Sequence, residues 1–188
     1  ILLQFPSYVV HKPASLAYLA WAVEQLDGDE PLVEFRHRSW LDEENRAATL
    51  AFLESIGATY VIVDAPKTDA QNLVPTVVAT TSKTAYVRFH GRNAATWNKR
   101  TGSAAERFDY LYSEAELEEW VAPLRELAGE ADSVYAMFNN NGRSAMPATG
   151  LEGLEPEEVA GDPASGEVAQ APANALMLKR LLGRPSGA

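Results

Sequence analysis

The chain has 188 residues, 46% of them hydrophobic and 22% charged, which is the composition of a globular protein with a core of its own. No apolar run reaches the ~20 residues of a membrane span, and without cysteine there are no disulfides and no thiolate chemistry. The net charge of −10 argues against a surface that coats nucleic acid, without excluding nucleic acid as a partner. The absence of cysteine and of a membrane span leads us to expect a cytoplasmic protein with no membrane partner.

Strand-like and helical segments alternate along the first half of the chain. A strand-like run at residues 1–5 precedes a helical pattern at residues 13–26 that begins with proline. A second run, residues 32–36, precedes a helix that we expect to start after Asp42 and to stop before Gly57. The third run spans residues 59–64, and the connection that follows it shows little helical periodicity.

The second half continues the alternation. Ser113 and Glu116 have the spacing of a capping box, which marks the start of a helix. The remaining predicted elements are strands at residues 84–90 and 133–138 and helices at residues 113–127 and 172–182. Residues 142–170 are rich in Gly, Pro, Ala, Ser and Glu, which predicts a flexible insertion or lid.

This alternation predicts the α/β class, with βα units and a parallel sheet. Without the insertion, each of the five βα units takes about 31 residues, and eight such units would reach the ~250 residues of a TIM barrel. The chain also starts directly in a strand. We therefore expect a single partial TIM-barrel-like domain over residues 1–188, an incomplete barrel with about five strands.

Polar side chains recur in phase along the five strands. Because side chains alternate along a strand and ligands bind at the carboxyl ends of parallel strands, we expect these residues to form one site. The residues predicted to share this inward face are Gln4, Glu34, Arg36, Asp64, Arg88, His90 and Asn139. Their apolar neighbours, such as Val33, Val61 and Val63, are expected to face the helices.

Basic residues gather at two of the predicted strand ends of this acidic protein, namely Arg36, His37, Arg38, Arg88, His90 and Arg92. A localised positive charge favours a small anionic ligand, and an arginine can hold a phosphate or carboxylate with two parallel hydrogen bonds. His90 could add a hydrogen bond or transfer a proton near neutral pH. The alternative is that the arginines form structural ion pairs with Glu34 and Asp64.

Two other chemistries use the same residues. Glu34 and Asp64 could form the carboxylate pair of a glycosidase, unless the arginines neutralise them. A divalent metal could be held by His37, His90, Glu34 and Asp64, but no short metal-ligand spacing is present and the arginines would repel a cation. We predict no cofactor and no metal ligands, with a divalent metal as the alternative.

Several motifs make the chain resemble the YecE-like family, also called domain of unknown function 72. The matching motifs are Leu3-Gln-Phe-Pro6, Val33-Glu-Phe-Arg-His-Arg-Ser-Trp40, Tyr86-Val-Arg-Phe-His-Gly-Arg92, Phe108-Asp-Tyr-Leu-Tyr-Ser113, Phe138-Asn-Asn140 and Ala171-Pro-Ala-Asn-Ala175. The resemblance implies a TIM-barrel-like fold whose N-terminal strands lie outside this chain, and it implies no particular reaction. The chain departs from the family pattern at Asn141, where His is common, and in the insertion.

We predict from these patterns Glu34, Asp64 and His90 as catalytic residues. The predicted substrate-binding residues are Gln4, Arg36, His37, Trp40, Arg88, Arg92, Tyr110, Asn139, Asn140 and Asn174. Three functions fit them: an enzyme acting on a small phosphorylated or carboxylated substrate, a metal-assisted phosphodiesterase acting on nucleic acid, and a non-catalytic anion-binding module. The oligomeric state cannot be inferred from the sequence.

Overall fold

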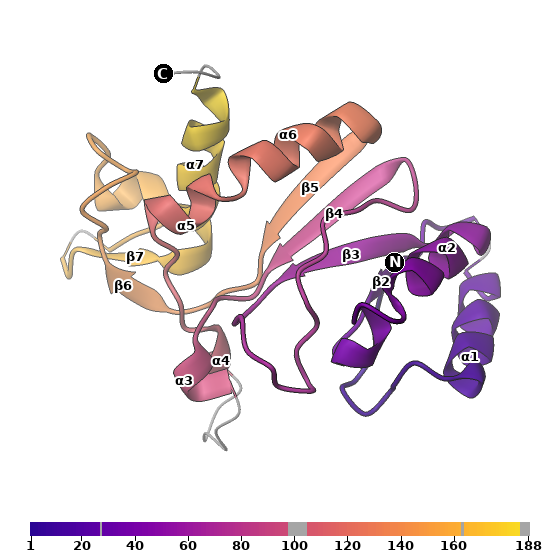
Figure 1. The fold of residues 1–188 in the computed structure, drawn as a ribbon. Coiled ribbons are helices and arrows are strands. Elements are labelled where there is room, and N and C mark those ends of the chain that lie inside the picture. Colours follow the sequence, from indigo (N-terminus) through magenta and orange to yellow (C-terminus); the bar gives the residue numbers. More distant parts are fainter. Residues whose placement is uncertain (27, 98–104, 163, 185–188) are drawn as a thin grey trace. The chain divides into compact units, whose positions relative to one another are not determined.

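A computed structural model of the chain describes residues 1–26, 28–97, 105–162 and 164–184. Its main feature is a five-stranded parallel sheet whose strands follow the order of the chain (Figure 1). The strands are β1 (Leu2–Gln4), β2 (Leu32–Glu34), β3 (Thr59–Asp64), β4 (Thr84–Phe89) and β5 (Ser133–Phe138). This confirms the α/β class and a TIM-barrel-like sheet that is not closed.

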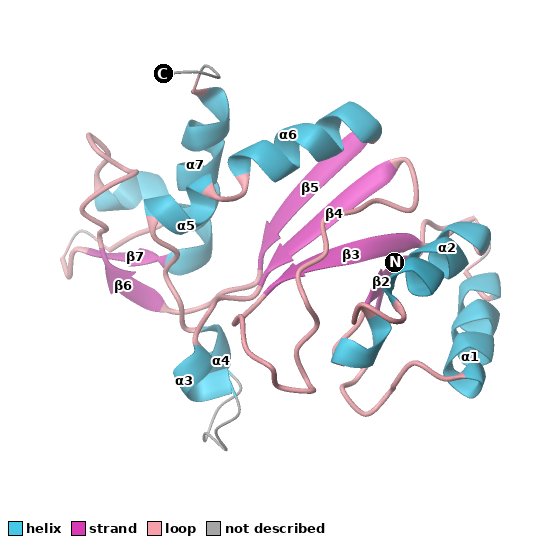
Figure 2. Cartoon of the chain, viewed as in Figure 1, coloured by secondary structure: helices cyan, strands magenta, loops and turns pink. Residues whose placement is uncertain are grey.

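Helices connect most of these strands (Figure 2). They are α1 (Pro13–Glu24), the short 3-10 helix η1 (Arg38–Trp40), α2 (Arg46–Ser55), α3 (Ala94–Trp97), α4 (Ala105–Phe108), α5 (Glu114–Glu118), α6 (Val121–Glu130), η2 (Pro156–Val159) and α7 (Gln170–Gly183). The connection between β3 and β4 contains no helix, as predicted. Within the described residues, no helix combines the length and the hydropathy that a membrane crossing needs.

The predicted capping box is present, but the helix that it opens is shorter than predicted. The Ser113 side chain accepts a hydrogen bond from the Glu116 backbone N–H, and the Glu116 side chain accepts one from the Ser113 backbone. Where one helix was predicted, α5 ends at Glu118 and α6 begins at Val121. Pro123 explains the break, because proline has no N–H to donate and is tolerated only in the first turn of a helix.

The contacts between Cα atoms divide the chain into two compact units. Unit 1 consists of Ile1–Arg88 and Leu127–Tyr135, and unit 2 of Phe89–Glu126 and Ala136–Ala188. The core of unit 1 includes Leu19, Val33, Phe35, Trp40, Leu53, Tyr60 and Ile62. The core of unit 2 includes Phe89, Tyr112, Leu117, Trp120, Val168, Met177 and Leu181.

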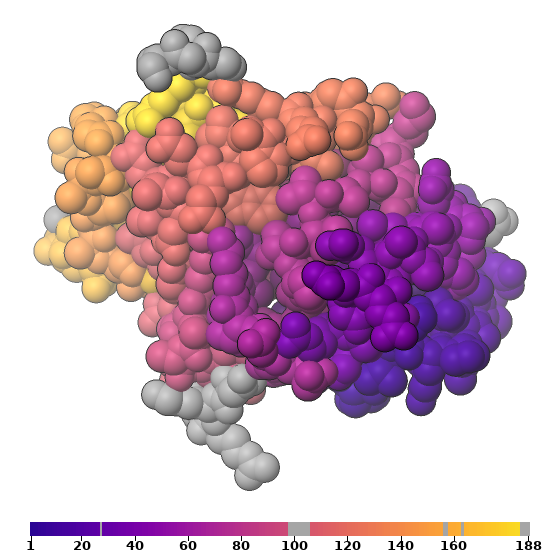
Figure 3. Space-filling view, in the orientation of Figure 1, coloured from indigo at the N-terminus to yellow at the C-terminus, as the bar shows by residue number. Residues whose placement is uncertain are grey.

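The segment predicted to be a flexible insertion has secondary structure of its own. Strands β6 (Arg143–Ala145) and β7 (Glu167–Ala169) pair in antiparallel fashion. Three apolar side chains of the segment, Leu151, Val159 and Val168, are buried. In Figure 3 the orange atoms of this segment lie against the yellow atoms of α7, and Arg180 of α7 donates a hydrogen bond to the Glu152 carbonyl at 3.1 Å. Buried Leu and Val side chains therefore anchor a segment whose composition predicted a loop.

Candidate functional site

Four of the predicted site residues meet in unit 1. Glu34, the last residue of β2, is fully buried and forms ion pairs with two arginines. Its Oε1 lies 2.5 Å from Nε of Arg36, and its Oε2 contacts Nη1 of Arg88. The same Nη1 donates a hydrogen bond to Oε1 of Gln4 at 3.2 Å. We call Gln4, Glu34, Arg36 and Arg88 the arginine–glutamate cluster.

The sheet register explains why these residues converge. Gln4 of β1 is paired with Glu34 of β2, and residues paired in a parallel sheet lie on the same face. The alternate residues, Phe5 and Phe35, lie on the other face, where their rings are 6.2 Å apart and Phe5 also contacts Tyr18 of α1. Alternation therefore places a polar cluster on one face and an aromatic core on the other, as predicted for β1 and β2.

Arg36 keeps part of its guanidinium group available. Its side chain is 14% exposed, and Nε contacts Glu34 as an ion pair without making a hydrogen bond. Within the described residues no hydrogen bond or ion pair of Nη1 or Nη2 is present. Burial is the largest influence on the pKa of Arg36 and lowers it; the Glu34 carboxylate raises this pKa, the positive charge of Arg88 lowers it, and the net result lies below the usual value. Glu34 therefore offsets only part of the cost of burying this cation.

The third strand has a different phase from the one predicted. The register pairs Val33 with Tyr60, so these two side chains share a face of the sheet. The sequence analysis had placed Val33 and Val61 on the same face. Continued along β3, this register puts Asp64 on the face of Val33 rather than on that of Glu34. All six residues of β3 are buried, so an alternation of exposed and buried positions does not distinguish the two faces of this strand. The register thus gives no support to a carboxylate pair of Glu34 and Asp64.

Tyr60 carries a buried polar atom without a partner. Its side chain is 1% exposed, and no hydrogen-bond partner for its hydroxyl exists among the described residues. Burial raises the pKa of Tyr60 well above its usual value, and the negative charge of Glu34 on the adjacent strand raises it further. Tyr60 was missed because its ring, at an aromatic-rich strand position, resembles an ordinary core side chain.

Two of the predicted substrate-binding residues in unit 1 have structural positions instead. The Trp40 ring is fully buried, stacks on Phe35 with 4.2 Å between ring centroids, and donates from Nε1 to the Val9 carbonyl at 2.8 Å. No face of this ring is open to a ligand, so the prediction for Trp40 is corrected to a core residue. The His37 ring accepts a hydrogen bond from the Ser39 backbone at 3.2 Å and so caps η1.

In unit 2, His90 and Asn139 lie together just beyond β4 and β5. His90 is fully buried, and its Nδ1 lies 3.1 Å from Nδ2 of Asn139. Since an amide nitrogen only donates, Nδ1 is the acceptor and carries no proton in this arrangement. The backbone N–H of Asn139 donates to the Phe89 carbonyl at 2.8 Å, which sets the two strand ends side by side.

Asn140, Asn174 and Tyr110 also meet in unit 2. Nδ2 of Asn140 donates to the Tyr110 carbonyl at 2.7 Å and to Oδ1 of Asn174 at 3.0 Å. Asn174 of α7 also bonds both backbone groups of Tyr112, at 2.9 and 3.0 Å. Both asparagines are buried, so the amides hold residues 110–112 against α7. This is a structural role for residues that we had predicted to bind substrate.

Gln170 belongs to the same group and was missed by the sequence analysis. Its Oε1 accepts from the Tyr110 N–H at 3.0 Å, and its Nε2 donates to Asp109 at 2.6 Å and to Ser144 at 2.7 Å. The residue is 2% exposed. It was overlooked because it closes the low-complexity segment, where no periodicity marks a buried position.

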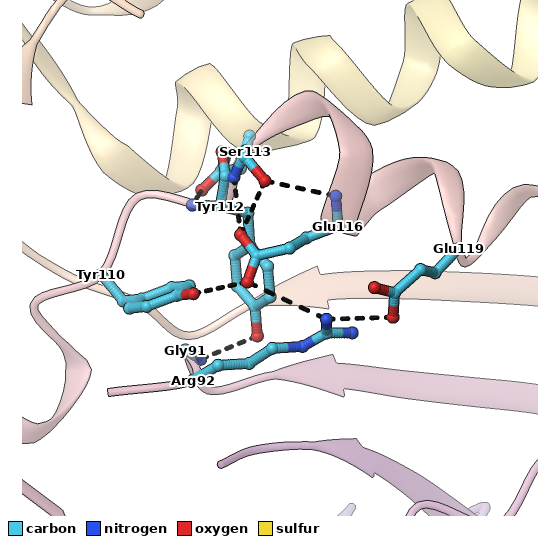
Figure 4. A network of polar contacts seen from close by, with 8 residues as sticks. Gly91, Arg92, Tyr110, Tyr112, Ser113, Glu116 and Glu119 are labelled. Atoms are coloured by element: carbon cyan, nitrogen blue, oxygen red, sulfur yellow. Dashed lines mark hydrogen bonds and ion pairs between the residues drawn. The ribbon is translucent and has the colours of Figure 1, made fainter. Parts of the chain in front are cut away.

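Arg92 is held by carboxylates in a neighbouring network (Figure 4). Its Nη1 lies 3.0 Å from Glu119 and 3.9 Å from Glu116, which also accepts a hydrogen bond from the Tyr110 hydroxyl at 2.5 Å. Arg92 therefore has acidic partners of its own within unit 2, which leaves its predicted role in substrate binding without support.

Gly91 is required by the protein's own packing in this network. Its φ is +85°, and a Cβ at this position would lie 2.6 Å from Cβ of Tyr110. Its backbone N–H donates to the Tyr112 hydroxyl at 2.9 Å. The group that approaches this glycine most closely is therefore the Tyr110 side chain.

The four side chains considered as metal ligands are divided between the two units. His37 caps η1 in unit 1 and His90 lies in unit 2, so the four-residue set is not assembled within either unit. No group of three or more His, Asp or Glu side chains within the described residues is arranged to hold a metal ion.

Comparison with known proteins places this architecture in a family. Residues 1–155 match the family described as "Protein of unknown function DUF72". The chain belongs to the DUF72 family. The UPF0759 protein YunF of Bacillus subtilis is 37% identical over 160 residues, which are 82% of this chain and 56% of YunF.

Solved structures of DUF72 proteins share the fold. A Thermotoga maritima DUF72 protein is 34% identical and superposes with a TM-score of 0.73, covering 97% of this chain and 57% of that protein. An Enterococcus faecalis DUF72 protein, at 24% identity, has a TM-score of 0.77 and covers 100% of this chain and 59% of its own. The chain thus spans rather more than half the length of these DUF72 relatives.

Proposed function

We propose that this DUF72 chain recognises a small anionic molecule, phosphorylated or carboxylated, through the arginine–glutamate cluster of unit 1. The observation that carries the proposal is the Arg36 guanidinium, whose Nε forms an ion pair with Glu34 while Nη1 and Nη2 have no partner among the described residues. Two adjacent N–H groups of a guanidinium match two oxygens of a carboxylate or phosphate. The lowered pKa of Arg36 supports the proposal, because a further negative charge would stabilise this cation.

Glu34 acts in this proposal as a positioning residue. Both of its carboxylate oxygens contact guanidinium groups, so neither is available to take a proton from a substrate. The sequence analysis had predicted Glu34 as a catalytic residue. The geometry instead favours a role in fixing Arg36 and Arg88 for the ligand.

The proposal extends to an enzyme that acts on such an anion in the longer DUF72 proteins. A non-catalytic binding module would use the same cluster and would differ only in the absence of product. No observation on the described residues favours the metal-assisted phosphodiesterase.

Binding of two simple probes tests the proposal. Purified protein is titrated with acetate and with methyl phosphate, each followed by NMR, and compared with Arg36→Gln. Charge-assisted hydrogen bonds contribute roughly 1.5–3 kcal/mol, so we expect the substitution to weaken binding about tenfold or more. Arg46→Gln is the matched control, because Arg46 is an exposed arginine of the same unit. Equal affinity of the wild type and Arg36→Gln for both probes would refute the proposal.

A further inference from the structure

Helix α1 exposes an uncharged side to solvent. No charged residue lies between Pro13 and Val23, and the buried positions of the helix are Ser15 and Leu19. The opposite side carries exposed residues with the i, i+3, i+4 and i+7 spacing of one helical face, namely Ala14, Ala17, Tyr18 and Trp21. We call these residues the α1 face. A helix that is apolar all round is normally covered on both sides.

The α1 face differs in composition from the exposed side of α2. The exposed residues of α2 include Arg46 and Glu54, charged side chains of the kind that usually cover a helix surface in water. The cores of protein–protein interfaces, by contrast, are depleted in charged residues and enriched in Tyr and Trp. The α1 face therefore has the composition of an interface rather than that of a free helix surface.

The two aromatic side chains of the α1 face are held in place by contacts within unit 1. Tyr18 and Trp21 are 55% and 54% exposed, and their ring centroids lie 5.6 Å apart with the planes inclined by 34°. The Tyr18 ring also meets the buried Phe5 ring edge-on, with 6.3 Å between the centroids. Rings that are already ordered lose little conformational entropy when a partner covers them, so this pair is suited to anchor an interface.

The α1 face is complementary in shape to a second copy of itself. When two copies of the helix run antiparallel about a two-fold axis, Ala14 of each copy lies at the level of Trp21 of the other, and Ala17 lies at the level of Tyr18. Each large ring thus meets a small side chain, which lets the helices approach closely and the side chains interdigitate. A parallel pair would place ring against ring and alanine against alanine.

The charges at the two ends of α1 favour the same arrangement. The exposed Lys12 immediately precedes the helix and the exposed Glu24 is its last residue, and neither forms an ion pair with any residue that the structure describes. In the antiparallel pair, Lys12 of each copy lies within about one residue, or roughly 1.5 Å along the axis, of the level of Glu24 of the other. A parallel pair would instead set lysine beside lysine and glutamate beside glutamate.

We propose that two copies of this chain associate through their α1 faces, antiparallel about a two-fold axis. This inference is independent of anion recognition, because it uses none of the residues of the arginine–glutamate cluster. The helix has only 12 residues, so the interface is small and the dimer should be weak, with a dissociation constant on the order of 10–100 µM.

Sedimentation velocity of the 188-residue chain tests the proposal. Between about 1 and 500 µM, the average sedimentation coefficient should rise from that of a monomer towards that of a dimer. Ala17→Glu sets two carboxylates close to the two-fold axis, and we expect it to weaken association at least about tenfold, because like charges across an interface repel. Ala47→Glu is the matched control, the same change at an exposed alanine of α2, and should leave association unchanged.

Exchange of the end charges tests the orientation of the two helices. Lys12→Glu and Glu24→Lys each turn both ion pairs into like-charge pairs, so each alone should weaken the dimer about fivefold. The doubly substituted protein restores opposite charges and should regain the wild-type affinity. The two single substitutions change the net charge of the chain in opposite directions, so a general charge effect would not weaken both. Both substitutions also suit the helix dipole, so the fold should tolerate them.

The outcomes decide both the interface and its orientation. Association that Ala17→Glu weakens and that the double charge exchange restores supports the proposal. A wild type that stays monomeric up to about 500 µM overturns it without the use of any variant. Association that Ala17→Glu leaves unchanged places the contact elsewhere, and a double exchange that fails to restore affinity excludes the antiparallel pair. Either of these results also overturns the proposal.

Discussion

Glu34 is the residue on which the unit 1 site depends. It is fully buried between Arg36 and Arg88, and both of its oxygens contact a guanidinium group. Removal of one partner from such a set leaves the other charges in a poorly solvated place, which costs more than the ion pairs themselves contribute. The stability of unit 1 and the orientation of Arg36 and Arg88 are therefore coupled through the Glu34 carboxylate.

Substitution of Glu34 should lower stability measurably. We expect Glu34→Gln to reduce the free energy of unfolding by about 3 kcal/mol, because two largely buried arginines lose their counter-charge. Urea unfolding followed by circular dichroism measures the change. Glu44→Gln, at an exposed position of the same unit, is the control and should stay within about 0.5 kcal/mol of wild type. A loss no larger than the control's would contradict the assigned role.

Removal of the buried Tyr60 hydroxyl should have the opposite effect. Because this hydroxyl is buried and has no partner within the described part of the chain, Tyr60→Phe removes a desolvation cost. We expect the free energy of unfolding to rise by about 1 kcal/mol, measured by urea unfolding. The exposed Tyr18, substituted in the same way, should show no such gain.

The pH dependence gives Tyr60 a second test. Its pKa in the folded protein lies above the usual value, so folding holds the proton more tightly than the unfolded chain does. Stability from this group is therefore complete below the unfolded pKa of about 10 and falls as the pH rises beyond it, by up to about 1.4 kcal/mol per pH unit. Tyr60→Phe should flatten this alkaline decline, and an unchanged decline would show that other groups cause it.

At the scale of elements, the strand-like runs and the helical spacing of apolar residues predicted most of the fold. The runs 59–64 and 133–138 match β3 and β5 in full, because β-branched and aromatic residues dominate them. The capping box at Ser113 was also predictable, since its two hydrogen bonds are local. The break between α5 and α6 could have been predicted from Pro123, a local signal that the apolar periodicity concealed.

The phase of β3 and the fold of residues 142–170 could not be predicted in this way. In β3 both faces are buried, so the pattern of residues does not say which face is which, and only pairing with β2 decides it. In the second case Leu151, Val159 and Val168 are widely spaced among Gly, Pro and acidic residues. Their burial depends on α7 and on the β6–β7 pairing, which are contacts between distant parts of the chain.

Two glycines provide a matched comparison at this scale. Gly91 and Gly57 both have positive φ, +85° and +69°, but only at Gly91 would a Cβ collide, 2.6 Å from Cβ of Tyr110. We expect Gly57→Ala to cost about 1 kcal/mol of stability from backbone strain alone. Gly91→Ala should cost at least about twice as much, because Tyr110 must also move. Thermal unfolding measures both, and equal losses would show that the contact with Tyr110 is unimportant.

For the whole molecule, the candidate site was predicted in part. Gln4, Glu34, Arg36 and Arg88 meet as the alternation implied, because the register of β1 and β2 agrees with the polar phase of the strands. His90 and Asn139 meet as well, in unit 2. The aromatic and amide residues were misjudged for a common reason: Trp40 and Asn174 satisfy packing and backbone hydrogen bonds, which a sequence motif does not distinguish from ligand binding.

The position of a bound anion tests the central claim most directly. The measurement is a crystal structure of the protein grown with dimethyl phosphate, with Arg36→Gln crystallised under the same conditions. Our account predicts phosphate oxygens within about 3 Å of Nη1 and Nη2 of Arg36 in the wild type and no bound anion there in the variant. Dimethyl phosphate bound elsewhere, with these two nitrogens facing water, would contradict it.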